Sequence, residues 1–399
     1  SCRCLRPAPA LSDCLSFEFL PEGLECRGFS DIWSLVAFRH QRWCSGRLDQ
    51  RVAQYLWKFV LSDELLQFCD CLQLCLCDVR VLISCCLQSV HGFHVISDLA
   101  SGRSLYYLVA SVLCAHESDV TLVARRKRRQ SLEKNGLILH SLLMGERVFH
   151  PAVTDTPASA GIQDMIFICT KTFSLVQALQ DVIPCIGPAT IVVPMMNGVD
   201  HDDITRRTIP CGIVVNTVIF VTCSYRDDYS IDQKSRYARL LVSSPGTAGA
   251  AEVAAVLNHE GELECTAVAD LRPELWHKFI LNCAYNTITA YYGCTTRGLA
   301  EHPERLQQFR TLIREAYAVA RAGDVPLDES VAEDIYDQIL HRRSLDDTSS
   351  TARDFLAHRP SELETFGGTL LRYAARWHVS VPLSESFYTS LWKKESSYR

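Results

Sequence analysis

Four short apolar segments, spaced so that a helix fits between neighbours, constrain most strongly what this chain can fold into. They are His94–Ile96, Val120–Ala124, Met165–Cys169 and Ala189–Val193. Their mostly continuous apolar character is typical of strands buried on both faces of a parallel sheet. Helical stretches at Leu105–Ala115 and Leu175–Val182 lie between them. Because parallel strands need crossover connections, usually helices, the pattern predicts an α/β fold with a parallel sheet.

The rest of the chain changes character after residue 268. Further strands are expected at Val214–Cys223 and Arg239–Val242, with a last helix at Ala250–Leu257. Beyond this point we expect only helices, near residues 272–293, 303–323, 329–342, 350–358 and 361–378. The sequence therefore predicts a Rossmann-like dinucleotide-binding domain over 91–268 and an all-helical domain over 269–396. Ligands of such proteins bind between domains, at the carboxyl ends of the strands.

Residues 1–90 differ in composition from everything that follows. They contain 11 of the chain's 19 cysteines and a single lysine, Lys58. The pairs Cys69–Cys71 and Cys75–Cys77 are too closely spaced for a usual zinc site, so no metal site is predicted. The other eight cysteines stand singly in apolar runs, which is typical of reduced core thiols. We interpret residues 1–90 as an extension without assignable chemistry and expect it to pack poorly.

Composition also excludes several classes of protein. The net charge is −6, with no acidic or basic tail, which argues against a dedicated nucleic-acid binder. No segment offers the eighteen or so uninterrupted apolar residues of a membrane span. The N-terminus does not resemble a secretory signal peptide. We expect a cytoplasmic protein, with the mitochondrion as the alternative, that acts on a small molecule as a monomer or homodimer.

Residues 272–293, RPELWHKFILNCAYNTITAYYG, predict a long, largely buried helix that begins at Pro273 and stops at Gly293. Lys278, Asn282 and Asn286 interrupt its apolar surface at steps of four, which places them on one face. One interpretation is a solvated stripe, in which Glu274 forms a surface ion pair with Lys278. The other is a polar row facing a cleft, since asparagine is a poor helix former.

The residues that follow the first two predicted strands indicate how the chain would bind a dinucleotide cofactor. A dinucleotide-binding loop follows G-x-G-x-x-G, but here Ser97 and Leu99 occupy the first two positions and only Gly102 remains. Arg125 follows the second strand, where a cation suits the 2′-phosphate of NADP. The residues up to Arg129 reinforce the positive charge; the alternative is a solvated basic turn.

Polar residues also follow the next two strands. Lys171 comes after the third strand and Asn197-Gly198 after the fourth, at the expected mouth of the crevice. In the helical half, Ser349-Ser350 precedes one helix and Ser361-Glu362 starts the next. For the last pair the simpler interpretation is an N-cap serine with a glutamate that complements the helix dipole.

These motifs, in this order, resemble the ketopantoate reductase (2-dehydropantoate 2-reductase) family over residues 92–392. The matching stretches are VTLVAR at 120–125, Asn135-Gly136-Leu137, Lys171-Thr172, Asn197-Gly198, the L-W-x-K-x-x-x-N-x-x-x-N helix from Leu275, Ser349-Ser350 with Asp354, and Ser361 to Glu364. The resemblance implies NADPH-dependent reduction of ketopantoate to pantoate, in pantothenate biosynthesis and hence the coenzyme A pathway.

The resemblance also implies roles for individual residues. Lys278 is the general acid, which protonates the carbonyl oxygen of the substrate. Asn282 and Asn286 hold substrate oxygens, Ser350 binds the carboxylate, and Glu362 takes the hydroxyl. The cofactor-binding residues that it implies are Gly102, Arg125, Lys171 and Asn197.

Departures from the family pattern leave alternatives open. Thr296 and Asp347 stand where the family often has Asn, so the substrate can be another branched 2-oxo acid. The altered loop allows a third possibility, a non-catalytic relic that keeps the fold. Because Leu99 occupies the position of closest approach to the pyrophosphate, we expect this chain to bind NADPH weakly or not at all.

Overall fold

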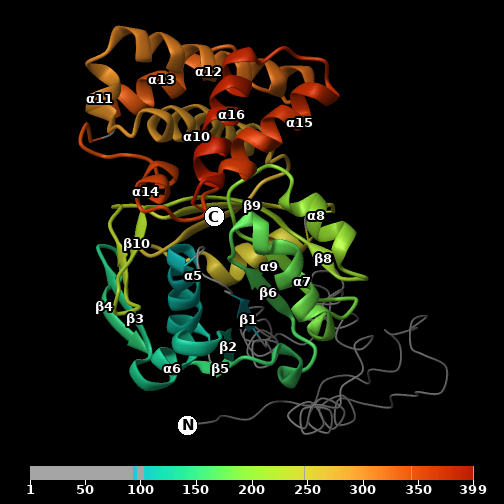
Figure 1. Cartoon of the computed structure of the whole chain (residues 1–399). Helices are drawn as coiled ribbons and strands as arrows, with labels where there is room; N and C mark the ends of the chain where they lie inside the picture. Colours follow the sequence, from blue (N-terminus) through green and yellow to red (C-terminus); the bar gives the residue numbers. More distant parts are fainter. Residues whose placement is uncertain (1–92, 97–102, 118, 247, 343, 399) are drawn as a thin grey trace, which may run out of the picture. The chain divides into compact units, whose positions relative to one another are not determined.

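The computed structural model describes residues 93–96, 103–117, 119–246, 248–342 and 344–398 (Figure 1). The chain divides after Val90, and every element below belongs to the unit His91–Arg399. The predictions made for residues 1–90 and for Gly102 lie outside the described residues. Within the described part, no helix combines the length and the apolar character needed to cross a membrane.

A six-stranded parallel sheet forms the first half of this unit. Its strands lie in the order β5-β2-β1-β6-β7-β8, and every neighbouring pair is parallel. They span β1 (Phe93–Ile96), β2 (Val120–Val123), β5 (Ala152–Thr154), β6 (Met165–Ile168), β7 (Ile191–Pro194) and β8 (Ile213–Val214). The strand order reverses between β1 and β6, the point at which such sheets bind ligands. The predicted α/β fold is therefore confirmed.

Alternating side chains explain why helices cover both faces of this sheet. On β6, Phe167 packs into one core and Ile166 and Ile168 into the other. Helix α5 (Arg103–His116) contributes Leu108 to the first core. Helix α7 (Leu175–Val182) contributes Leu179 to the second. Continuous apolar strands are thus buried on both sides, as their sequences predict.

Two smaller sheets complete the α/β half (Figure 1). One has the order β10-β11-β3-β4, with β3 (Leu137–Ser141), β4 (Gly145–Phe149), β10 (Cys223–Tyr225) and β11 (Ile231–Gln233). The other has the order β13-β12-β9, with β9 (Asn216–Phe220), β12 (Arg239–Ser243) and β13 (Glu264–Ala267). Helix α9 (Ala248–Leu257) and helix α8 (His201–Thr208) lie on this half too.

Three expectations for this half need correction. Val214–Cys223 is not one strand: β8 pairs parallel with β7, and β9 then pairs antiparallel with β12, so the chain changes sheets near Val215. The basic run after Arg125 is not a turn, because helix α6 (Arg126–Asn135) begins there. The β3–β4 pair was not expected either. Its β4 residues are largely exposed, so their sequence carries no apolar alternation.

The second half is all-helical, as predicted, and its helices gather in one cluster (orange to red in Figure 1). They are α10 (Arg272–Tyr292), α11 (Thr296–Ala300), α12 (Pro303–Ala322), α13 (Val331–Arg342), α14 (Ser350–Leu356), the π-helical turn η5 (Glu364–Gly368), α15 (Thr369–Arg376) and α16 (Pro382–Ser396). Helix α10 is central, with Phe279, Ile280 and Ile288 in a core shared with α12 and α13. Helices α11 and α16 were not expected from the sequence.

The cysteines of the described part are free thiols, in agreement with their isolated positions in the sequence. Cys169, Cys185, Cys265 and Cys283 are buried, and burial raises the pKa of each thiol. They therefore pack as small apolar side chains.

Candidate active site

The carboxyl edge of the parallel sheet carries three of the predicted residues. Arg125 follows β2, Lys171 follows β6, and Asn197 follows β7. Because these strands are parallel, their carboxyl ends share one edge of the sheet. The hydroxyl of Thr172 donates to the Asn197 carbonyl at 3.1 Å, which ties the second and third of these loops together.

Lys278 lies on α10, whose start and end follow from its sequence. Pro273 stands in the first turn, and Gly293 ends the helix in the left-handed region at φ 61°. The Lys278 ammonium donates from Nζ to the main-chain oxygen of Ile219 on β9, at 2.6 Å. Nζ also lies 5.6 Å from the ring centroid of Phe220. These contacts to β9 favour the polar-row interpretation over that of a surface ion pair with Glu274.

Burial changes the protonation of Lys278. Loss of water around the half-buried side chain lowers the pKa of Lys278 to about 8, and the Glu362 carboxylate partly opposes this by favouring the ammonium. An amine with a pKa near neutral is well suited to give up a proton during catalysis. His201 of α8 is fully buried nearby; burial lowers the pKa of His201, and the charge of Lys278 lowers it further.

Glu362 connects the two halves of the site. Its Oε2 accepts from the Asn197 amide at 3.3 Å, and the residue is only 7% exposed. Burial raises the pKa of Glu362, whereas Lys171, Asn197 and Lys278 act in the opposite direction. The carboxyl group thus bonds with the Asn197 amide, and the charges of Lys171, Lys278 and Asp354 act on it as well.

Lys171 is held by a partner that the sequence does not reveal. Its Nζ forms an ion pair with Asp354 of α14 at 2.8 Å, and it donates to the Pro360 carbonyl at 3.4 Å. Arg359 contacts the other oxygen of Asp354 at 3.0 Å. These contacts join the loop after β6 to the segment that carries Glu362. Asp354 lies 183 residues from Lys171 in the chain, so no local pattern predicts the pair.

The serines near Glu362 make local hydrogen bonds, and only Ser349 is a helix N-cap. Ser349 is the N-cap of α14, and its hydroxyl accepts from the Ala352 N–H at 3.0 Å. Ser361 accepts from the Leu363 N–H at 3.2 Å. The Glu362 carboxylate instead contacts Asn197. Ser350 begins α14 and is exposed, whereas Thr351 and Ala352 after it are buried.

Asn282 and Asn286 follow Lys278 on the same face of α10, as their spacing predicts. Asn282 is partly exposed, and Asn286 is 5% exposed. Thr296 and Asp347 lie near the far end of α10. The Thr296 hydroxyl is fully buried and bonds with the Tyr285 hydroxyl at 2.8 Å, while the Thr296 N–H donates to the Asp347 carbonyl at 2.9 Å. These two residues therefore hold the loop before α14 in place.

Arg125 stands apart from the group around Lys278. Its guanidinium forms an ion pair with Asp181 of α7 at 2.8 Å, and Gln177 donates to the other oxygen of that carboxylate at 3.0 Å. Arg128 lies over the Tyr225 ring, and Arg129 pairs with Glu133 and Asp155. The basic cluster is thus fixed on α6 beside the strand end, where a ribose phosphate is bound in related sheets.

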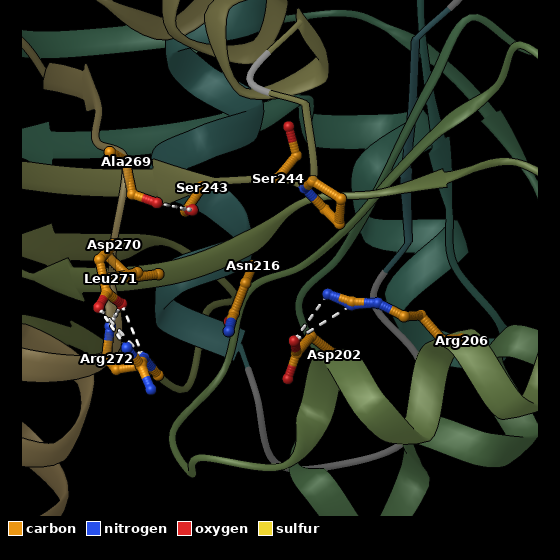
Figure 2. Close-up of a pocket in the computed structure, with 10 residues that line it drawn as sticks. Asp202, Arg206, Asn216, Ser243, Ser244, Ala269, Asp270, Leu271 and Arg272 are labelled. Carbon is orange, nitrogen blue, oxygen red and sulfur yellow. Dashed lines mark hydrogen bonds and ion pairs between the residues drawn. The ribbon is translucent and has the colours of Figure 1, made fainter. Parts of the chain in front are cut away.

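A separate hollow of about 240 Å³ contains none of the predicted site residues. Its polar lining consists of Asn216, Ser243, Ser244 and the ion pairs Asp202–Arg206 and Asp270–Arg272. Figure 2 shows Asn216 between the two ion pairs. Each arginine in this hollow is paired with an aspartate close to it in the sequence. Within the described residues there is also no group of three or more His, Cys, Asp or Glu that could hold a metal ion.

A Rossmann-type domain joined to a helical domain that contributes a half-buried lysine is typical of a dinucleotide-dependent class of oxidoreductase. Comparison with known proteins agrees. Residues 107–244 match the family model described as Ketopantoate reductase PanE/ApbA, and residues 270–395 match that of its C-terminal part. The chain belongs to the ketopantoate reductase PanE/ApbA family of oxidoreductases.

Individual relatives are distant. The 2-dehydropantoate 2-reductase of Streptococcus pyogenes serotype M3 is 26% identical over 255 residues, which is 63% of this chain and 82% of that protein. Among solved structures, the PanE/ApbA family ketopantoate reductase of Ralstonia eutropha JMP134 aligns with a TM-score of 0.70 at 23% identity, over 77% of this chain and 99% of that one. A D-mandelate dehydrogenase, solved with NADH and anilino(oxo)acetate, aligns with a TM-score of 0.68 at 18% identity, over 77% and 99%. At these identities the structural matches establish the fold.

Proposed function

We propose that this protein reduces 2-dehydropantoate (ketopantoate) to pantoate with NADPH, the reductive step of pantothenate biosynthesis. The observation that carries the proposal is the environment of Lys278, a lysine whose pKa is lowered to about 8 by burial and whose charged form is favoured by Glu362. Membership of the family and the name of the S. pyogenes relative support the choice of substrate.

In this mechanism, bound NADPH supplies the hydride that adds to the C2 carbonyl carbon of the 2-oxo acid. Negative charge then develops on the carbonyl oxygen. The Lys278 ammonium stabilises that charge and gives its proton to the oxygen from Nζ. The Ile219 carbonyl holds Nζ in place until the transfer.

The remaining polar groups would bind the substrate. Asn282 and Asn286, on the Lys278 face of α10, donate to substrate oxygens. Ser350 at the start of α14 binds the carboxylate with its hydroxyl. Glu362 takes the hydroxyl group of the substrate.

The cofactor would lie along the carboxyl edge of the parallel sheet, in a dinucleotide-binding domain that we place at residues 91–268. The strand order fits this, since it reverses at β1 and β6. Arg125 would bind the 2′-phosphate that distinguishes NADPH from NADH. Lys171 and Asn197 would contact the reacting end, and Gly102 the pyrophosphate. The helical domain that we place at residues 269–396 would close over the substrate.

A second candidate is the reduction of another branched 2-oxo acid. The D-mandelate dehydrogenase shares the fold with a different substrate and with NADH. Thr296 and Asp347, which depart from the family pattern, hold the loop before α14. A shift of this loop would move Ser350, and the substrate carboxylate that Ser350 is proposed to bind would then lie in a different position.

The test is an assay of ketopantoate beside a series of branched and aromatic 2-oxo acids, with NADPH or NADH at concentrations up to millimolar. The proposal predicts the highest kcat/KM for ketopantoate. It also predicts that kcat/KM is higher with NADPH than with NADH by about one to two decades. This factor corresponds to the contribution of about 1.5–3 kcal/mol from one charge-assisted contact. The Arg125→Ala variant should lose this preference and keep its activity with NADH. Equal use of both cofactors by the native protein contradicts the role of Arg125, and a better 2-oxo acid supports the second candidate.

A further inference from the structure

The end of strand β9 contacts Lys278 in two ways. The Ile219 carbonyl oxygen accepts a hydrogen bond from Nζ at 2.6 Å, and the Phe220 ring centroid lies 5.6 Å from the same atom. A cation within about 6 Å of an aromatic ring centroid, over its face, is attracted by the ring quadrupole. The attraction grows where water is excluded, and burial has removed much of the water around Lys278. Nζ therefore has one strong acceptor and one aromatic neighbour on consecutive residues.

The alternation of side chains along β9 explains why Phe220 is available for this contact. Ile219 packs into the core of the parallel sheet, whereas Val218 and Phe220 pack against the core of the helical cluster that contains α10. The antiparallel register with β12, in which Phe220 lies opposite Arg239, fixes this alternation. A slip of one residue would reverse it and remove the ring from Lys278.

We propose that Phe220 is a positioning residue for Lys278, whose ring face, together with the Ile219 carbonyl, keeps the ammonium in place and favours its charged form. This inference deepens the proposed function, because it concerns the group that acts there as the proton donor. Together with burial and Glu362, Phe220 contributes to the pH range in which that donor holds its proton.

Other charges also act on Lys278, and none of them lies on β9. Glu362 before η5 and His201 on α8 interact with it electrostatically. Arg239 on β12 lies opposite Phe220, and Glu274 and His277 are sequence neighbours of Lys278 on α10. Glu362 favours the ammonium, and His201 interacts unfavourably with it. A substitution of Phe220 leaves all of these groups in the chain, so its effect on Lys278 can be separated from theirs.

The experiment measures the pKa of Lys278 directly, by NMR of the full chain with ¹³C-labelled lysine. Lysine is scarce in this sequence, and the signal of Lys278 is assigned by its loss in a Lys278→Arg variant. Phe220→Leu keeps an apolar side chain of similar size but removes the quadrupole. We expect the pKa of Lys278 to fall by about one pH unit, a tenfold change in proton affinity. The alkaline limb of the rate profile should move to lower pH by the same amount.

Two variants serve as matched controls. Phe220→Tyr keeps the ring and should leave the pKa of Lys278 near its native value. Val218→Ala removes packing from the same face of β9, two residues away, and should lower thermal stability without moving that pKa. A pKa that stays constant or rises in Phe220→Leu overturns the inference, as does an equal fall in Phe220→Tyr. The titration needs no substrate, so it tests this inference separately from the proposed function. If the protein reduces no 2-oxo acid but the pKa of Lys278 falls in Phe220→Leu, only the proposed function is contradicted.

Discussion

At the scale of single residues, Lys278 is the position where the chemistry can be tested most directly. Lys278→Ala should lower turnover by about 10²–10⁴, because it removes the proton donor and the charge opposite the developing oxyanion. Affinity for the cofactor should change little. The exposed Lys393 of α16 gives the control, since Lys393→Ala removes a lysine that is not a predicted site residue. Near-native turnover of Lys278→Ala contradicts its assignment as the acid.

The same lysine predicts a pH dependence with a definite sign. Burial lowers the pKa of Lys278 from its ordinary value near 10.5 to about 8, and the acid must start protonated. Activity should therefore be retained below pH 8 and fall as the pH rises through that value. A lysine with an unchanged pKa would keep the enzyme active up to about pH 10. The full profile of kcat/KM decides between the two.

Substitution of Glu362 tests whether its carboxylate binds the substrate or only stabilises the start of a helix. Glu362→Ala should mainly raise KM, because it removes a ligand-binding group that is bonded to Asn197. Since Glu362 favours the charged form of Lys278, Glu362→Gln should also lower the pKa of Lys278 and move the alkaline limb to lower pH. Steady-state kinetics and thermal melting of both variants provide the measurement. A loss of stability with unchanged KM would support the helix-dipole interpretation instead.

At the scale of elements, the end of α10 depends on one glycine. Gly293 adopts φ 61° and ψ 36°, and a Cβ added there would meet no atom within 4 Å. Gly293→Ala should thus cost only the backbone strain of the left-handed region, about 1–2 kcal/mol. Gly293→Asn should cost less, because asparagine tolerates this conformation. The measurement is the urea unfolding midpoint of the native protein and of the two variants. Equal midpoints for the native protein and Gly293→Ala would contradict the expected backbone strain.

The elements also show how far sequence reasoning reaches. The limits of α10 were predictable because Pro273 and Gly293 mark them locally. The break near Val215 was not, since it depends on which sheet accepts each half of an apolar run. The same holds within the candidate site. Helical spacing alone aligns Lys278 with its two asparagines, but no local pattern indicates that a carbonyl of β9 meets its ammonium 59 residues away.

At the scale of the whole molecule, the proposed reaction needs both halves of the described unit to function together. The helical half supplies Lys278 and Glu362, and the sheet edge supplies the cofactor side. The first strand ends at Ile96 and α5 begins at Arg103, so residues 97–102 connect them where a pyrophosphate meets a helix N-terminus in related folds. Activity therefore depends on a segment remote in sequence from the proposed acid.

The glycine pattern of that segment leads to the last prediction. Glycines are needed there because main-chain N–H groups must approach the pyrophosphate without an intervening Cβ. Leu99 introduces a branched side chain and Asp98 a negative charge, and Arg125 acts at the far end of the adenosine half. Fluorescence titration of the native chain should show only weak NADPH binding, which is why the activity assays use cofactor at concentrations up to millimolar. Ser97→Gly with Leu99→Gly should restore affinity, whereas the control pair Ser97→Ala with Leu99→Ala should restore less, because both Cβ atoms remain. A micromolar dissociation constant for the native chain would mean that the loop tolerates these residues and that the alignment of its glycine positions is wrong.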